Sequence, residues 1–97
     1  MEPGIPDISI SDVVLSPAGR DRGQLVYCVG TDDQFVWLAD GKGRTLDKPK
    51  RKKRKHVQKV LRAETRVALK LRNSDKVLNS ELRRDLAFLI REIQSMT

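Results

Sequence analysis

Six consecutive basic residues, Lys50 to Lys55, lie inside the chain in the stretch "LDKPKRKKRKHVQ". Six adjacent cations would repel one another strongly in a protein interior, so we expect an exposed loop over residues 48–55. The Lys48-Pro49 pair stiffens the entry to this loop, and strand-like sequence resumes at His56. A loop held at both ends loses less entropy on binding than a free tail, which favours contact with nucleic-acid phosphates. A merely solvated loop and a nuclear-import signal are the alternatives.

A second basic turn lies earlier in the chain, within "SPAGRDRGQLVYCVG". Gly19 and Gly23 flank Arg20-Asp21-Arg22, and glycines allow a tight turn that other residues resist. Such a turn can bring backbone amides and two guanidinium groups close to a phosphate or a base edge. By itself the signal is weak, because many β-turns contain glycine and arginine.

The remaining reactive side chains do not form a catalytic or metal-binding set. Cys28 stands in the apolar run "LVYCVG", where a buried structural thiol is expected rather than a nucleophile. His56 is the single histidine, and with one cysteine it cannot complete a metal site of ordinary ligand count. Asp32-Asp33 has the composition of a turn, and "GKGRT" lacks the spacing of a phosphate-binding loop. We therefore expect no enzymatic activity, no metal and no cofactor.

The positive charge of the chain is local. Its 97 residues have a net charge of +7, but residues 1–41 carry two arginines against seven acids. Residues 42–72 carry fourteen basic against two acidic residues, and residues 73–97 carry four of each. A local field of this sign attracts polyanions, chiefly nucleic acid or an anionic membrane surface. Aromatic residues make up only 4% of the chain, so an aromatic-walled pocket for a small-molecule substrate is not expected.

We expect a cytoplasmic protein that does not enter a membrane. The start "MEPGIPDISIS" is acidic and lacks the apolar segment of a secretory signal. The apolar run "LAFLI" is far too short to span a bilayer. A single cysteine cannot form an internal disulfide, which fits a reducing compartment.

The first two thirds of the chain have the pattern of short strands. Apolar, β-branched and aromatic runs between Gly- and Asp-containing turns predict strands over residues 13–16, 24–30, 35–40, 44–46 and 56–61. Several short strands with tight turns suggest a small five-stranded barrel. We expect a flexible N-terminus over residues 1–7, the barrel over 8–61 and a helical appendage over 62–97.

The C-terminal third changes to a helical period. An amphipathic helix is predicted by an apolar stripe of five residues: Leu82, Leu86, Leu89, Ile90 and Ile93. Asn79 or Ser80 can cap the start of this helix with a short polar side chain. A weaker helical turn is expected over residues 64–72. We expect both to pack on the barrel or on each other, with a dedicated docking helix as the alternative.

The two basic elements together resemble a known family. "SPAGRDRGQLVYCVG" is similar to the KOW motif, a β-loop-β element of ribosomal proteins and transcription elongation factors. "LADGKGRTLDKPKRKKRKHVQ" resembles bacterial KOW-domain RNA-binding proteins related to a large-subunit ribosomal protein of archaea and eukaryotes. The family's pattern falls on Gly19 to Gly23, Ala39 to Gly41 and Lys48 to His56, and the resemblance covers residues 12–58. Arg22 stands where the family usually has lysine, and Lys42-Gly43 is an insertion.

The resemblance implies a mainly β fold, an SH3-like (KOW) five-stranded barrel, that binds RNA. The expected partners are structured, ribosomal RNA and also ribosomal proteins, which places the protein in translation. The expected RNA-binding residues are those of the two basic elements and the turn between them: Ser16, Gly19, Arg20, Arg22, Gly23, Lys42, Arg44, Lys48, Lys50, Arg51, Lys52, Lys53, Arg54, Lys55 and His56.

Two further possibilities follow from the same sequence. Tyr27, Phe35 and Trp37 alternate with other residues in the expected strands; two are expected in the core, and the one left exposed can stack on a base. The alternative function is a protein-interaction module that docks on a ribosomal or transcription complex through its C-terminal helix.

Overall fold

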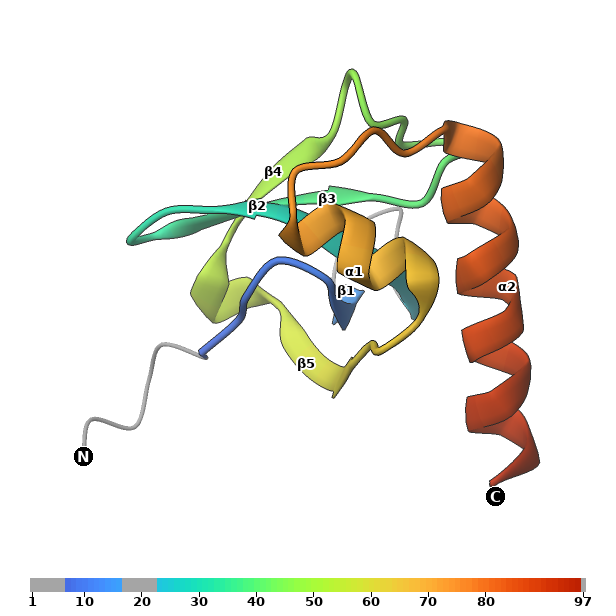
Figure 1. Ribbon diagram of the computed structural model, residues 1–97. Helices are drawn as coiled ribbons and strands as arrows, with labels where there is room; N and C mark the ends of the chain where they lie inside the picture. The colour runs from blue at the N-terminus through green and yellow to red at the C-terminus, as the bar shows by residue number, and fades with distance from the viewer. Residues whose placement is uncertain (1–6, 17–22, 97) are drawn as a thin grey trace.

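The computed structural model describes residues 7–16 and 23–96 of the chain, and Figure 1 shows their arrangement. The described residues form five strands, a one-turn 3-10 helix and two α-helices. In chain order the elements are β1 (Asp12–Ser16), β2 (Gln24–Thr31), β3 (Phe35–Ala39), β4 (Lys50–Lys53), η1 (Arg54–His56), β5 (Gln58–Arg62), α1 (Arg66–Arg72) and α2 (Asn79–Ser95). The expected mainly β domain with a C-terminal helix is confirmed.

All five strands belong to one antiparallel sheet with the order β4-β3-β2-β1-β5. The sheet is not closed into a barrel, because β4 and β5 form its two edges and do not pair with each other. The prediction of a closed barrel, in which hydrogen-bonded strands run continuously around the sheet, is therefore wrong. The two edges nevertheless follow each other in the chain, joined by residues 54–57. A connection this short brings one end of each edge strand close to the other, so the sheet must curl.

Side chains alternate between the two faces of the sheet and form two separate apolar clusters. The helix cluster contains Val13, Tyr27, Ala39, Ala63, Val67, Ala68, Leu82, Leu86 and Leu89. The strand cluster on the opposite face contains Ile8, Val14, Val26, Cys28, Val36, Leu38 and Val57. Cys28 is buried as predicted, and burial raises the pKa of its thiol to about 11. At neutral pH it is a thiol in the core and not a nucleophile.

Both predicted helices are confirmed, and in Figure 1 α2 stands at one side of the sheet, with its C-terminal part extending past the strands. Leu82, Leu86 and Leu89 are buried in the helix cluster, so the apolar stripe packs inside this domain. The predicted cap is wrong. The carboxylate of Glu81 accepts a hydrogen bond from the Leu78 amide (3.1 Å), which holds the start of α2. Within the described residues, no helix is long and apolar enough to cross a membrane.

Three side chains tie the two helices to the sheet. The hydroxyl of Tyr27 on β2 donates a hydrogen bond to the carboxylate of Asp85 on α2. The hydroxyl of Thr65 donates to the same carboxylate oxygen at 2.7 Å and also accepts from the Ala68 amide, which caps α1. Burial, and then the bond to Asp85, raises the pKa of Tyr27 above its ordinary value. The phenol therefore stays protonated and keeps donating to Asp85.

The segment between β3 and β4 is a series of turns, so the strand predicted over residues 44–46 is wrong. The Asp40 carboxylate accepts hydrogen bonds from the amides of Lys42 (2.8 Å) and Arg44 (2.9 Å), which bends the chain where a strand would continue. Asn79, the first residue of α2, accepts a hydrogen bond from the Leu46 amide at 2.8 Å. Its side chain therefore fixes this segment against the helix and does not cap it.

Gly41 lies close against the start of α2. Its φ is +82°, a conformation that costs other residues energy. A methyl group at Gly41 would lie 2.3 Å from the backbone oxygen of Asn79, whereas a methyl group at Gly43 would meet nothing within 4 Å. The start of α2 can approach the sheet this closely only because residue 41 has no side chain.

We expect Gly41→Ala to destabilise the domain and the matched control Gly43→Ala to leave it nearly unchanged. The left-handed conformation alone costs alanine about 1 to 2 kcal/mol, and the backbone clash adds to it. For a domain of this size we expect the melting temperature to fall by about 10 °C or more. Thermal unfolding followed by circular dichroism measures both variants. Equal melting temperatures for the two alanines would contradict this packing of α2.

Candidate nucleic-acid interface

The sequence predicted that the basic block is a loop. In the structure it forms the edge strand β4 followed by η1. Its backbone pairs with β3 in the register Phe35↔Lys53 to Leu38↔Lys50. Pairing is compatible with the charge because successive side chains of a strand point to opposite faces, which separates neighbouring cations. An edge position also lets the long side chains reach water. The prediction of exposure is therefore right for alternate residues, and the prediction of a loop is wrong.

The two faces of β4 have different roles. Arg51 and Lys53 are exposed on one face, whereas Lys50 and Lys52 are partly buried on the other. The amino group of Lys52 lies 3.1 Å from the hydroxyl of Ser16, which is itself buried at the end of β1. Ser16 and Lys52 therefore link β4 to β1 inside the curled sheet. Ser16 is buried and Lys52 is partly buried, so the described contacts give both a role in the fold.

Arg54 also serves the fold. Its guanidinium donates hydrogen bonds to the backbone oxygens of Asp32 (2.8 Å) and Ile8 (2.9 Å). Its backbone amide donates a hydrogen bond to the backbone oxygen of Gln34 (2.9 Å). These bonds join η1 to the β2–β3 turn and to the segment before β1. A charged donor on several carbonyl oxygens is a strong structural contact. Arg54 is thus used inside the domain.

The Asp32-Asp33 pair is a turn, as predicted. The Asp32 carboxylate accepts hydrogen bonds from the amides of Phe35 (2.7 Å) and Gln34 (2.9 Å). These two bonds lower the pKa of Asp32 below its ordinary value. The carboxylate therefore stays charged at neutral pH and holds the hairpin that begins β3.

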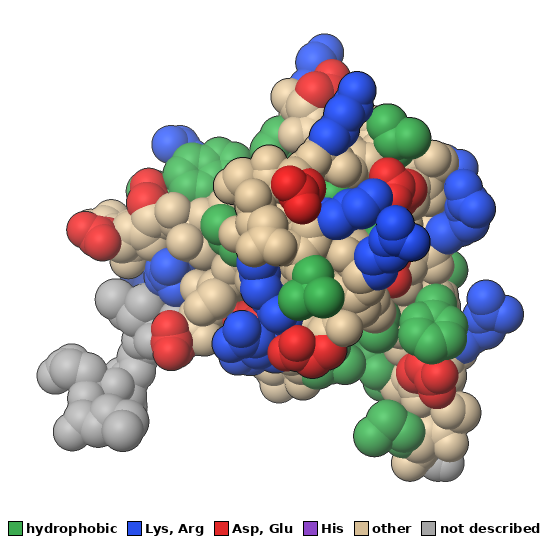
Figure 2. Space-filling view, viewed as in Figure 1, with side chains coloured by type: hydrophobic (Ala, Val, Ile, Leu, Met, Phe, Trp, Pro, Cys, Tyr) green, Lys and Arg blue, Asp and Glu red, His purple; other side chains and the backbone are tan. Residues whose placement is uncertain are grey.

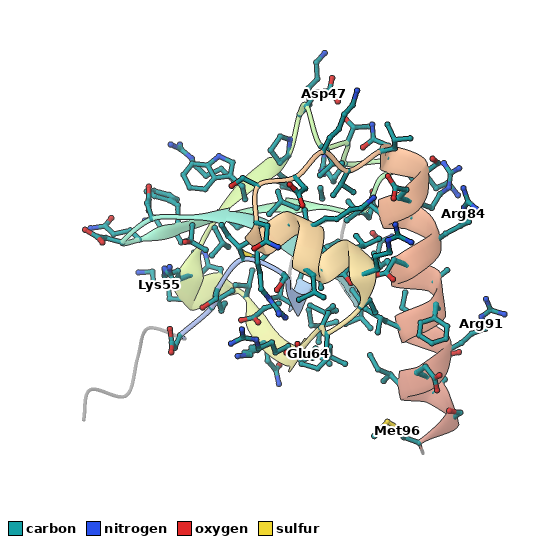
Figure 3. All side chains as sticks on the ribbon, in the orientation of Figure 1. Asp47, Lys55, Glu64, Arg84, Arg91 and Met96 are labelled. Atoms are coloured by element: carbon teal, nitrogen blue, oxygen red, sulfur yellow. The ribbon has the colours of Figure 1, made fainter. Side chains whose placement is uncertain are left out.

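Four exposed cations remain on the β4 side of the domain and define what we call the basic edge: Lys48, Arg51, Lys53 and Lys55. None of them makes an ion pair with the described residues. His56 is exposed beside them on η1. In Figure 3, Lys55 lies on the side of the molecule away from α2, whereas Arg84 and Arg91 project from α2.

The other predicted contact residues lie elsewhere or outside the described residues. Lys42 and Arg44 belong to the turn segment near α2, and Lys42 is exposed there. Gly23 is exposed with φ +79°, a conformation that glycine adopts readily, and its amide donates to the Ser16 oxygen at 2.9 Å. The remaining three lie outside the described residues: Gly19, Arg20 and Arg22.

The sequence did not show which aromatic side chains are exposed. Tyr27 is fully buried, but both Phe35 and Trp37 are only partly buried, so one aromatic and not two lies in the core. The guanidinium of Arg51 lies over the Phe35 ring, 4.5 Å from its centre. The sequence does contain the alternating run "FVW" and the basic run "RKK". They show which aromatic side chains lie beside cations only once the pairing register of the two strands is known.

Positive side chains also occur away from the basic edge. Figure 2 shows Lys and Arg along α2, with acidic side chains among them. On α2 the exposed ring of Phe88 follows Arg84 and precedes Arg91 on one helical face. Among the described residues, no group of three or more His, Cys, Asp or Glu side chains could hold a metal ion. The interface candidates are therefore cationic surfaces.

Comparison with protein-family models gives no match for the chain, and comparison with curated proteins gives no similar sequence.

We expect Arg54→Gln to lower stability and the neighbouring control Lys55→Gln to leave it unchanged. The glutamine cannot reproduce the two guanidinium bonds to Asp32 and Ile8, and we expect a loss of about 1 to 2 kcal/mol in the free energy of unfolding. An exposed lysine without a partner should contribute less than about 0.5 kcal/mol. Urea unfolding measures both values. A stable Arg54→Gln protein would return Arg54 to the set of residues available for binding.

Proposed function

We propose that this protein is a non-catalytic RNA-binding domain that contacts the phosphate backbone through the basic edge. The observation that carries the proposal is the placement of Lys48, Arg51, Lys53 and Lys55 on a paired strand and its flanking turns, without ion pairs to the described residues. These cations release counterions from RNA when they bind, and the paired backbone of β4 does not have to be ordered on binding.

We further propose that the domain is of the SH3-like KOW class and that its target is structured, ribosomal RNA. Three observations support the class: the five antiparallel strands, the pairing of β1 with both β2 and β5, and the one-turn η1 between the two edge strands. The glycine turn conformation at Gly23 agrees with the turn that the KOW motif requires. The ribosomal target rests on the resemblance of residues 12–58 alone.

The alternative function, docking on a protein complex through α2, remains a second proposal with one supporting observation. The apolar stripe of α2 packs inside the domain, but Phe88 on another face is 48% exposed. Arg84 and Arg91 flank it at helical spacing. A docking partner would therefore meet this arginine-flanked ring and not the leucines.

The basic edge is tested by Lys48→Gln/Lys53→Gln/Lys55→Gln against a charge-matched control, Lys76→Gln/Arg84→Gln/Arg91→Gln. Both triple variants lose three positive charges, but the control loses them on the helical side. We expect the basic-edge variant to bind RNA at least tenfold more weakly and to lower the slope of log affinity against log salt by roughly 2 to 3. The control should change little.

Binding is measured by fluorescence anisotropy of a labelled RNA over a series of salt concentrations. If the two variants lose affinity equally, the effect comes from net charge and the basic edge is not the contact surface. If the control variant alone loses binding, α2 is the interaction surface, and the second proposal takes precedence.

A further inference from the structure

The outer face of β3 carries two aromatic side chains that core packing does not explain. Phe35, Trp37 and Ala39 alternate along β3 and so share one face of the sheet. Ala39 belongs to the helix cluster, but Phe35 and Trp37 belong to neither apolar cluster. The helices thus cover one end of this face, and the aromatic end stays partly exposed. Large aromatic rings outside the core commonly serve recognition.

The neighbouring strand surrounds these rings with cations. In the β3–β4 register Arg51 is opposite Trp37 and Lys53 is opposite Phe35. The Arg51 guanidinium carbon lies over the Phe35 ring at 4.5 Å from its centre. A guanidinium group can also stack on other flat aromatic systems, such as a nucleobase. This arrangement presents alternating π-surfaces and positive charge.

The strand on the other side leaves Trp37 without a side-chain neighbour at the paired position. That position is Gly30, opposite Trp37 in the β2–β3 register. A methyl group there would lie 3.6 and 3.7 Å from Cβ and Cε3 of Trp37, which is ordinary van der Waals contact. A side chain at this position would therefore lie against the indole, and glycine supplies none.

We infer that Trp37 and the Phe35–Arg51 pair form a stacking platform for unpaired nucleobases. The inference rests on the proposed RNA-binding function and specifies its substrate class: single-stranded segments, such as the loops of a structured RNA. Bases in a duplex are already stacked on one another, whereas an unpaired base can place its face on an aromatic ring or a guanidinium plane. Lys53 lies beside the platform and supplies a cation for the phosphate of the same nucleotide.

The single tryptophan of the chain makes this platform directly observable, because intrinsic tryptophan fluorescence then reports on Trp37 alone. The probes are a single-stranded oligouridine and a blunt RNA duplex of similar charge. We expect the single strand to quench the fluorescence in a saturable manner and the duplex to leave it unchanged. A single strand that binds, as measured by anisotropy, without changing Trp37 fluorescence would overturn the platform.

A variant pair tests the same point by affinity. We expect Trp37→Leu to bind the single strand about tenfold more weakly, with an unchanged salt slope and unchanged duplex binding. Phe88→Leu, which removes the exposed ring on α2, should bind like the unsubstituted protein. Equal single-strand affinity for Trp37→Leu and the unsubstituted protein would overturn the inference.

The outcomes separate this inference from the proposed function. The protein can bind RNA in a salt-dependent manner while its fluorescence is not quenched and Trp37→Leu has no effect. This result would support the phosphate contacts and contradict the stacking platform. If the protein binds neither RNA, both the proposed function and the stacking platform are wrong. If circular dichroism shows that Trp37→Leu does not fold, the quenching experiment on the unsubstituted protein still tests whether Trp37 contacts the bases.

Discussion

Repulsion among six adjacent cations constrains the rest of this structure. Such a segment cannot be a central strand, where both neighbours and both faces would enclose it, so it lies at the edge of the sheet. Pairing on one side fixes its backbone, while the charged side chains keep the other side from pairing with another chain. Because β4 is an edge and residues 54–57 lead directly into β5, the opposite edge must curl toward it. The open but curled sheet follows from this placement.

The fold then divides the cations between structure and surface. Lys52 and Arg54 are bonded to Ser16, Asp32 and Ile8, which holds β4 and η1 against the rest of the domain. This leaves the basic edge on a rigid support, and rigid support lowers the entropy lost on binding. At the other end of the sheet, the hydrogen bonds of Tyr27 and Thr65 to Asp85 fix the helices over the end of β3 near Ala39. The aromatic end is left beside the basic edge.

Local patterns in the sequence predicted much of this fold and failed where distant contacts decide. The strands β2 and β3 and both helices follow from apolar alternation and helical spacing, and the burial of Cys28 follows from its apolar neighbours. The strand character of "KRKK" depends on pairing with β3, which no local pattern contains. The roles of Arg54 and Asn79 as contacts to remote backbone are equally invisible in the sequence. Which aromatics are exposed depends on where the helices end.

We propose that the edge formed by β3, β4 and η1 is the surface that meets RNA. The most direct test follows the backbone amide resonances of the protein during titration with a single-stranded RNA. We expect the largest shifts in β3, β4 and η1, on the side that Lys55 marks in Figure 3. Large shifts confined to α2, around Arg84 and Arg91, with none in β4, would contradict it.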